Sequence, residues 1–232
     1  MNGRPQNESV LESLGVVIPT LNAGATLAAT LDAVRGVAEV VVADGGSTDD
    51  TRAVAQAAGA RVVEAAGGRG AQLAAGARAV RGGWLMFLHA DTVPQPGWRE
   101  AAAAFMARSE NRERAAVFAY ATELDGRAAR RLEAYVAWRT RALGLPYGDQ
   151  GLLIARAFYD RLGGFRSLPI MEDVDMVRRI GRARLVVLAA RALTSGRRYR
   201  RAGVVPRGAR NLACLALYLL GVPPRLIQRL YG

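Results

Sequence analysis

The chain has 232 residues, 51% apolar and 22% charged, so it can bury a core of ordinary size and is not a disordered tail protein. Its formal charge of +12 is uneven. Residues 176–232 contain 13 arginines and no acidic residue, whereas residues 1–175 contain 19 arginines and 20 acidic residues. The single cysteine, Cys214, excludes an internal disulfide, and the single histidine, His89, argues against a multi-histidine metal site.

The first half of the chain alternates short apolar strands with helices. Strands are predicted near residues 15–20, 39–43, 61–64 and 84–88, and helices near residues 25–35, 47–58 and 71–80. Ser47 or Thr48 is the predicted cap of the second helix. This alternation predicts an α/β fold with a Rossmann-like, mainly parallel central sheet flanked by helices, and a ligand at the carboxyl ends of its strands.

Polar residues follow three of these strands. Thr20–Asn22 follows the first strand, Asp44–Asp49 the second and His89–Thr92 the fourth. Because the carboxyl ends of neighbouring parallel strands meet at one edge of a sheet, we expect the three loops to line one crevice.

After Pro94 the pattern becomes less regular. Helices are predicted near residues 98–108, 127–143 and 172–180, and strands near residues 115–123 and 185–188. An apolar segment, 152–154, follows a break at 147–151, and a terminal helix is expected from about Arg210. Since no internal repeat or linker is visible, we expect one domain with a second, irregular half.

The acidic loop residues each have two interpretations. Asp44 fits a turn before a capped helix as well as it fits a ligand-binding carboxylate. His89 and Asp91 could provide ligands for a divalent cation that bridges diphosphate oxygens, or Asp91 could cap the following turn. Glu172 and Asp173 suit the first turn of a helix, whose dipole favours acids. Asp173 could instead take a proton from an attacking hydroxyl, with Glu172 orienting the groups around it.

The segment Arg197–Arg201 contains four arginines around one tyrosine. Such a run is usually a solvated face or a nonspecific contact for polyanions. A diphosphate leaving group would give it a sharper role, because arginine can neutralise the charge that develops as the bond breaks.

Taken in order, these motifs resemble the family 2 glycosyltransferases, which have the GT-A fold. The resemblance extends over about residues 15–201 and is closest to small bacterial members with His-Ala-Asp-Thr, Gly-Asp-Gln and Met-Glu-Asp motifs, some of which are assigned to arsenosugar biosynthesis. The segments that resemble the family are Val17–Asn22, Val41–Asp49, Phe87–Thr92, Gly163–Phe165 and Met171–Asp173.

The resemblance implies transfer of a sugar from a nucleoside diphosphate donor to a hydroxyl acceptor, with inversion at the anomeric carbon. It implies that Asp173 is the general base, assisted by Glu172, and that Asp91 holds Mg²⁺ or Mn²⁺, with His89 as a candidate second ligand. The residues implied to bind the nucleotide sugar are Thr20, Asn22, Asp44, Arg69, His89 and Asp91. Those expected on the diphosphate or acceptor side are Asp149, Gln150, Arg197, Arg198 and Arg200.

Two positions depart from the family pattern. His89 stands where the first acid of an Asp-x-Asp metal motif is usual, and Gly45 stands where a second aspartate often follows Asp44. The first departure weakens the case for tight metal binding, since His89 could ligate manganese, hydrogen-bond the ribose or simply pack. Arg197–Arg201 only loosely resembles the Gln-x-x-Arg-Trp motif of processive members, so polymer synthesis is not expected.

On this resemblance, residues 1–14 are an N-terminal extension and residues 15–205 a GT-A domain, with a nucleotide-binding half, 15–95, and an acceptor half, 96–205. Residues 206–232 form an amphipathic helical tail, too short in its apolar part to cross a bilayer. The tail could pack on the domain, join a homodimer or lie in a membrane interface. We therefore expect a cytoplasmic protein, with peripheral contact to the inner face of the membrane if the acceptor is lipid-linked rather than a small molecule.

Two other classes compete with a glycosyltransferase. A nucleotidyltransferase would normally show a glycine-rich, basic loop after the first strand, where this chain has Pro19–Asn22. A non-enzymatic, arginine-rich polyanion-binding protein would explain the tail but not Asp44, Asp91 and Asp173. No specific nucleic-acid partner is expected.

Overall fold

The computed structural model describes residues 10–231, apart from the side chains of Arg198, Arg201, Ala202, Val204, Val205 and Tyr231. Residues 1–9 of the expected N-terminal extension lie outside the described residues. The strands are β1 (Leu14–Thr20), β2 (Glu39–Asp44), β3 (Arg61–Glu64), β4 (Trp84–Phe87), β5 (Thr92–Pro94), β6 (Ala115–Thr122), β7 (Leu152–Ala155) and β8 (Leu185–Thr194).

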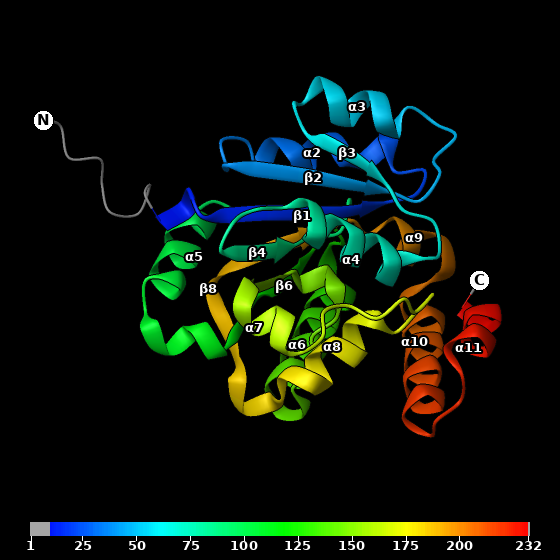
Figure 1. Cartoon of the computed structure of the whole chain (residues 1–232). Helices are drawn as coiled ribbons and strands as arrows, with labels where there is room; N and C mark the ends of the chain where they lie inside the picture. The colour runs from blue at the N-terminus through cyan, green and yellow to red at the C-terminus, as the bar shows by residue number, and fades with distance from the viewer. Residues whose placement is uncertain (1–9, 232) are drawn as a thin grey trace, which may run out of the picture.

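The helices lie between and after these strands (Figure 1). They are α2 (Gly24–Ala33), α3 (Thr51–Ala57), α4 (Arg69–Ala79), α5 (Trp98–Met106), α6 (Gly126–Leu143), α7 (Arg156–Arg161), α8 (Glu172–Ile180), α9 (Arg197–Ala202), α10 (Val204–Leu219) and α11 (Pro224–Tyr231). Short 3-10 turns occupy Ser109–Glu113, Gly148–Gln150 and Arg182–Arg184.

The strands of the described chain form one sheet in the order β3-β2-β1-β4-β7-β6-β8-β5. The first four strands are parallel to one another. Beyond β4 the sheet is mixed, because β7 runs antiparallel to both β4 and β6, while β6 and β8 are parallel and β5 is antiparallel to β8. The α/β fold is confirmed, and the mainly parallel arrangement applies to the half that contains β1 to β4.

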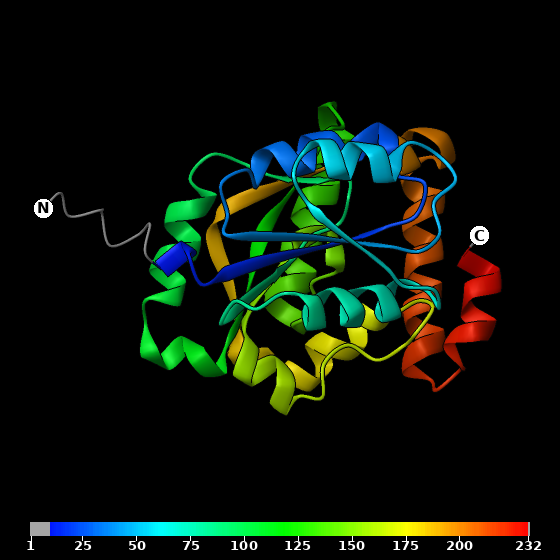
Figure 2. The ribbon, with the colours of Figure 1, turned by 45° about the horizontal axis from the view of Figure 1, so that its top comes forward.

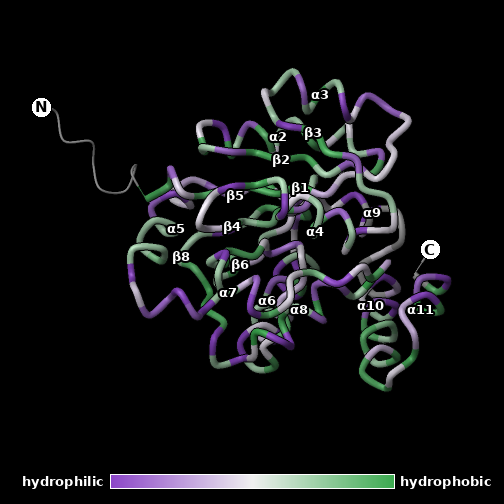
Figure 3. Tube along the Cα trace, viewed as in Figure 1, coloured by the Kyte–Doolittle hydropathy of each residue, from purple (hydrophilic) through white to green (hydrophobic). Residues whose placement is uncertain are grey.

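The parallel half is covered on both faces. Figure 2 shows α2 and α3 on one side of β1 and β2 and α4 on the other. The central strands are apolar along their length, as a sheet buried on both faces requires, and they are among the hydrophobic segments of Figure 3. Helix α4 approaches β1 closely at Gly76, where a Cβ atom would lie 2.3 Å from Cγ1 of Val17.

Some elements differ from the predictions. Helix α3 begins at Thr51, and Asp49 rather than Ser47 or Thr48 accepts the hydrogen bond from its first N–H group, at 3.0 Å. Strand β8 continues to Thr194, well past the predicted end at Leu188, and its last residues pair with the unpredicted β5. The extra residues are mainly alanine, arginine and leucine, which carry no strong strand signal. Helix α7 was also not predicted.

The C-terminal segment forms two helices rather than one starting at about Arg210. Helices α10 and α11 lie next to each other, at the end of the molecule toward which β1 and β2 point (Figures 1 and 2). Cys214, Leu215 and Ile227 are buried against Ile170, Met171 and Val174. The tail therefore packs on its own domain, and within the described residues no helix is long and apolar enough to span a membrane.

Candidate active site

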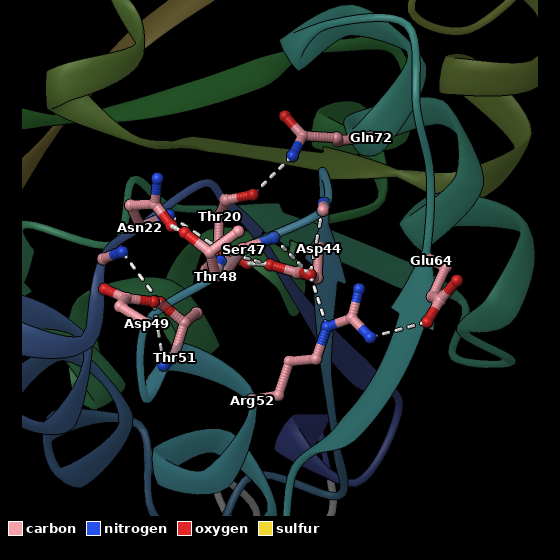
Figure 4. A network of polar contacts seen from close by, with 12 residues as sticks. Thr20, Asn22, Asp44, Ser47, Thr48, Asp49, Thr51, Arg52, Glu64 and Gln72 are labelled. Atoms are coloured by element: carbon pink, nitrogen blue, oxygen red, sulfur yellow. Dashed lines mark hydrogen bonds and ion pairs between the residues drawn. The ribbon is translucent and has the colours of Figure 1, made fainter.

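The loop after β2 is built around the carboxylate of Asp44, which is fully buried (Figure 4). This carboxylate accepts hydrogen bonds from the N–H groups of Gly46 and Ser47 and from the hydroxyls of Thr20 and Ser47. The guanidinium of Arg52 adds an ion pair at 2.7 Å. Burial alone would raise the pKa of Asp44, but these hydrogen bonds outweigh it and lower the pKa to about 2.

The same network joins the loops after β1 and β2. The side-chain oxygen of Asn22 accepts a hydrogen bond from the N–H of Thr48 at 2.9 Å, and the N–H of Asn22 donates to the hydroxyl of Ser47. Gln72 on α4 donates to the carbonyl of Thr20, and its Nε2 would lie 2.4 Å from a Cβ atom at Gly45. An aspartate after Asp44, which the family often has, would therefore collide with Gln72.

These loops border a crevice of about 420 Å³ at the carboxyl ends of β1, β2 and β4. As predicted, all three loops contribute to its lining. Asp44 itself lies beneath the lining, with its oxygens occupied by the network. The predicted site residues that line the crevice are Thr20, Asn22, Arg69, His89 and Asp91, and other lining residues include Gly45, Gln72, Pro169, Ile170 and Gln228.

A second cavity, of about 100 Å³, adjoins the crevice. Arg69, His89, Asp91 and Ile170 line both spaces, so they form a shared wall. The predicted residues Asp149 and Asp173 line the second cavity, together with Tyr147, Met171, Val174, Thr194, Ser195, Tyr199, Arg207 and Asn211. The structure thus brings Asp91 and Asp173 to one cavity from positions 82 residues apart in the chain.

Asp173 is held by the backbone on two sides. Its Oδ2 accepts a hydrogen bond from the N–H of Gly148 at 2.9 Å, and its Oδ1 accepts one from the N–H of Val174 at 2.8 Å. Gly148 also lies against His89, because a Cβ atom there would be 2.3 Å from the imidazole Nε2. The absence of a side chain at Gly148 therefore lets Asp173 and His89 approach the same turn.

Glu172 supports the shared wall through its contact with Arg69. It is fully buried and forms an ion pair with Arg69, the residue on the shared wall. Burial raises the pKa of Glu172, and the nearby Arg69 opposes this effect. Its Oε2 has no hydrogen-bond partner among the described residues. Glu172 therefore fixes Arg69 and the start of α8 and does not line either of the two spaces.

Asp149 has the opposite environment to Asp44. Its Oδ1 is buried without a hydrogen-bond partner in the described part of the chain. Burial raises the pKa of Asp149 to about 6, with Asp173 and Asp91 adding to the effect and Arg139 opposing it. A carboxyl group with a displaced pKa, facing a cavity with two further carboxylates, is typical of a functional site.

Backbone strain also concentrates here. In the described residues, the only non-glycine residues with a left-handed backbone are Asn22, with φ 51°, and Met171, with φ 65°. Asn22 lines the crevice and Met171 the second cavity. Such conformations persist where the surrounding structure enforces them, often at ligand sites.

The comparison with known protein families decides the class. The sequence profile of glycosyl transferase family 2 matches residues 15–153, which extend from β1 into the start of β7 and include most of the crevice lining. The chain belongs to glycosyl transferase family 2. No protein of curated function matches the chain.

Solved structures similar to this family 2 glycosyltransferase confirm the GT-A fold. One is glucosyl-3-phosphoglycerate synthase from Mycobacterium tuberculosis in complex with Mn²⁺, UDP and glucosyl-3-phosphoglycerate, with TM-score 0.56 and 22% identity over 84% of this chain and 77% of that one. Another is the same synthase with Mn²⁺, UDP-glucose and phosphoglyceric acid, with TM-score 0.57 and 24% identity over 81% and 74% of the two chains.

Besides Asp44 and Glu172, four predicted residues of this family 2 glycosyltransferase are absent from the described lining of both spaces. Gln150 is buried and bonds Thr140 and the carbonyl of Phe118. Arg197 is exposed and Arg200 pairs with Glu123, and neither lines the crevice or the second cavity. The side chain of Arg198 lies outside the described residues.

Other residues at the site were not predicted. Arg52 and Gln72 support the crevice, whereas Tyr147, Tyr199, Arg207 and Asn211 line the second cavity. Tyr147 precedes the predicted segment 148–150 and Tyr199 lies within Arg197–Arg201, so their positions in the sequence could have indicated that they belong to the site. Asn211 and Arg207 reach the cavity only because α10 folds back on α8, and no local pattern indicates this contact.

The donor set limits how a metal could bind. Among the described residues, no group of three or more His, Cys, Asp or Glu side chains could hold an ion. Asp91 and His89 share the wall between the two spaces. Mg²⁺ is commonly bound through one or two protein ligands, with phosphate oxygens and water completing its shell. These residues fit a divalent cation that arrives with a diphosphate, and not a site made by the protein alone.

Proposed function

We propose that this glycosyltransferase moves a sugar from a nucleoside diphosphate donor to a hydroxyl acceptor, with inversion at the anomeric carbon. The observation that supports it is the shared wall: Asp91 borders both spaces, and Asp173 borders only the second. A donor in the crevice and an acceptor in the second cavity would meet at this wall. The nucleotide-binding half would then be residues 15–95, and the acceptor half residues 96–205.

The crevice is the proposed nucleotide site. Its volume of about 420 Å³ is within the range of small-molecule sites, and its lining includes Thr20, Asn22 and Arg69. Asp44 would act through Thr20 and the loop, since its oxygens are already bonded. Arg69 would lie near the donor diphosphate, on the wall where both spaces meet.

Asp173 is the proposed general base. The acceptor oxygen would attack the anomeric carbon on the face opposite the diphosphate, form the new glycosidic bond, and lose its proton to Asp173 while the bond to the diphosphate breaks. The N–H groups of Gly148 and Val174 keep the carboxylate oriented toward the cavity. A positioned base of this kind contributes on the order of 10²–10⁴ in rate.

The proposed cation site consists of Asp91, with His89 as a candidate second ligand. Mg²⁺ or Mn²⁺ bound there would supply positive charge to the departing diphosphate. The similar glucosyl-3-phosphoglycerate synthase structures contain Mn²⁺ with UDP or UDP-glucose, which supports this assignment. We expect excess chelator to abolish transfer and added Mn²⁺ to restore it. Full activity in chelator would exclude the cation from the proposal.

The substitution Asp173→Asn tests the function. Asparagine keeps the shape and one oxygen acceptor, so donor binding should persist while transfer falls by about 10²-fold or more. Thermal shift with a panel of nucleoside diphosphate sugars, with and without Mn²⁺, measures binding, and release of nucleoside diphosphate measures turnover. Asp160→Asn, on the exposed surface of α7, is the matched control. Near-normal transfer by the Asp173→Asn protein would refute the assignment of the base.

We further propose that α10 and α11 contact an anionic membrane surface, which would suit a lipid-linked acceptor. Leu212, Leu219, Leu220, Leu226 and Leu230 remain exposed although the helices pack on the domain. Arg225 and Arg229 lie on α11 beside two of these leucines. Leucines flanked by arginines suit the boundary between acyl chains and anionic head groups. A homodimer is the alternative use of the same face.

A further inference from the structure

The second cavity contains two buried oxygens that lack a hydrogen donor. Oδ1 of Asp149 and Oδ1 of Asn211 are both inaccessible to solvent and without a partner among the described residues. Both residues line this cavity, Asp149 from the turn before β7 and Asn211 from the C-terminal helix α10. A buried acceptor without a partner destabilises the fold, so native proteins rarely keep such atoms without a use.

Helix α10 closes this cavity. Arg207 and Asn211 are both on its first half, four residues apart, so they lie on one face of the helix. The opposite end of α10 is anchored by Cys214 and Leu215, which are buried against Met171 and Val174. The segment with no acidic residue therefore completes the wall that faces Asp173.

Acceptor oxygens line the cavity around the proposed base, alongside donors such as Arg69, His89 and Arg207. Asp91, Asp149 and Asp173 all line it, and Asn211 adds a fourth side-chain oxygen. The aromatic rings of Tyr147 and Tyr199 also line it. Carboxylate and amide oxygens pair with hydroxyl groups, and aromatic faces pack against the C–H groups of a sugar ring or carbon chain.

From these contacts we infer that the acceptor is a neutral polyhydroxylated molecule, a sugar or polyol, bound by Asp149 and Asn211. The inference rests on the proposed function and specifies the acceptor class. One hydroxyl would face Asp173 for transfer, while neighbouring hydroxyls donate hydrogen bonds to Oδ1 of Asp149 and Oδ1 of Asn211. Because α10 supplies Asn211, the C-terminal segment sets acceptor choice.

A phosphorylated acceptor fits these contacts less well. A phosphate needs donors, and the three carboxylates in this cavity would repel it. The arginines that line this cavity, and that such a group would contact, are Arg69, which pairs with Glu172, and Arg207. The two acceptor classes therefore depend on different residues, which makes them separable by experiment.

The test compares acceptors and variants of the full chain. The probes are glucose and glycerol as neutral acceptors, and glycerol 3-phosphate and 3-phosphoglycerate as charged ones, each with a donor that gives a thermal shift. We expect acceptor-dependent release of nucleoside diphosphate with a neutral probe. Asn211→Leu and Asp149→Leu should each raise the KM for that probe about tenfold or more, with donor KM unchanged.

Conservative and matched variants separate binding from folding. Asn211→Asp and Asp149→Asn keep an oxygen acceptor and should retain a KM closer to that of the unmodified protein. Ala213→Ser, at an exposed position on α10 that lines neither space, should leave it unchanged. Turnover only with the phosphorylated probes, lost on Arg207→Ala but not on Asn211→Leu, would overturn the inference. Failure of every nucleoside diphosphate sugar to shift the melting temperature would instead refute the proposed donor.

Discussion

At the residue scale, two aspartates show how the surroundings of a carboxylate set its pKa in opposite directions. Asp44 accepts hydrogen bonds from backbone, hydroxyl and guanidinium donors, and its pKa falls to about 2 although burial opposes this. Asp149 has one oxygen buried without a donor, and burial raises its pKa to about 6. The first carboxylate stabilises a loop, whereas the second is costly to keep ionised and faces a cavity.

Asp149→Asn should make the protein more stable at neutral pH. The folded-state pKa of about 6 exceeds the ordinary value of 3.8, so the folded protein binds the proton more tightly and stability falls as pH rises from about 4 to about 6. Removing this charge should raise the free energy of unfolding by roughly 2–3 kcal/mol at pH 7.5, at 1.36 kcal/mol per pKa unit, with little change at pH 4. Urea denaturation at both pH values measures it, with Asp160→Asn as control. Equal stability at pH 7.5 would contradict the assigned environment.

Arg52→Met should destabilise the protein in a pH-dependent way. The folded-state pKa of Asp44, about 2, is below the ordinary value of 3.8, so its contribution is present above about pH 4 and is lost as pH falls toward 2. Losing Arg52 should therefore lower the free energy of unfolding, measured by urea denaturation, at pH 7 and lower it less at pH 3. The control is Arg35→Met, whose pair with Asp32 is exposed and should change stability by less than about 0.5 kcal/mol. A pH-independent cost would show that Arg52 acts through packing alone.

At the element scale, the site depends on how closely α4 approaches the segment before α8. A Cβ atom at Gly68 would lie 2.9 Å from Cα of Pro169, and one at Gly70 would lie 2.2 Å from the carbonyl oxygen of Arg166. The N–H of Gly70 donates to the carbonyl of Leu168. This contact between α4 and residues 166–169 places Ile170 in the wall between the crevice and the second cavity.

Gly70→Ala should therefore be destabilising even though alanine favours helices. The added methyl group meets backbone atoms that cannot rotate away, which should cost roughly 1–3 kcal/mol and raise the donor KM through Arg69. At Gly83 the same substitution meets open space, and we expect a change within about 0.5 kcal/mol. Chemical denaturation and donor titration measure both variants. Similar behaviour of the two would show that α4 can shift without cost.

The elements that could be predicted from the sequence are those whose own residues carry a clear helix or strand pattern. The buried runs of β1, β2 and β4 and the acidic first turn of α8 were recognisable because their patterns are local. The end of β8 was not recognisable, since its residues have no strong strand propensity and the strand continues there by pairing with β5. The same distinction holds at the site. Asp91 and Asp173 belong to motifs, whereas Asn211 reaches the cavity only through packing of α10 on α8.

At the scale of the whole molecule, the fold partly explains the uneven charge. Arginines of the last quarter pair with acids from the first three quarters: Arg179 with Asp175, Arg191 with Glu133 and Arg200 with Glu123. Arg225 and Arg229 form no such pair within the described part of the chain. The unneutralised charge therefore includes α11, beside its exposed leucines.

The proposed membrane contact predicts that the protein floats with vesicles containing phosphatidylglycerol but not with vesicles of phosphatidylcholine alone. Each arginine near an anionic surface contributes about 1 kcal/mol, so salt should weaken binding, and burial of leucine supplies the remainder. The triple variant Leu220→Ser, Leu226→Ser and Leu230→Ser removes exposed side chains without opening the core, and it should stay folded but no longer float. Leu143→Ser, an equally exposed leucine on α6, should float normally. If the unmodified protein instead sediments as a dimer that the triple variant dissociates, without vesicle binding, the leucine face joins two copies of the chain.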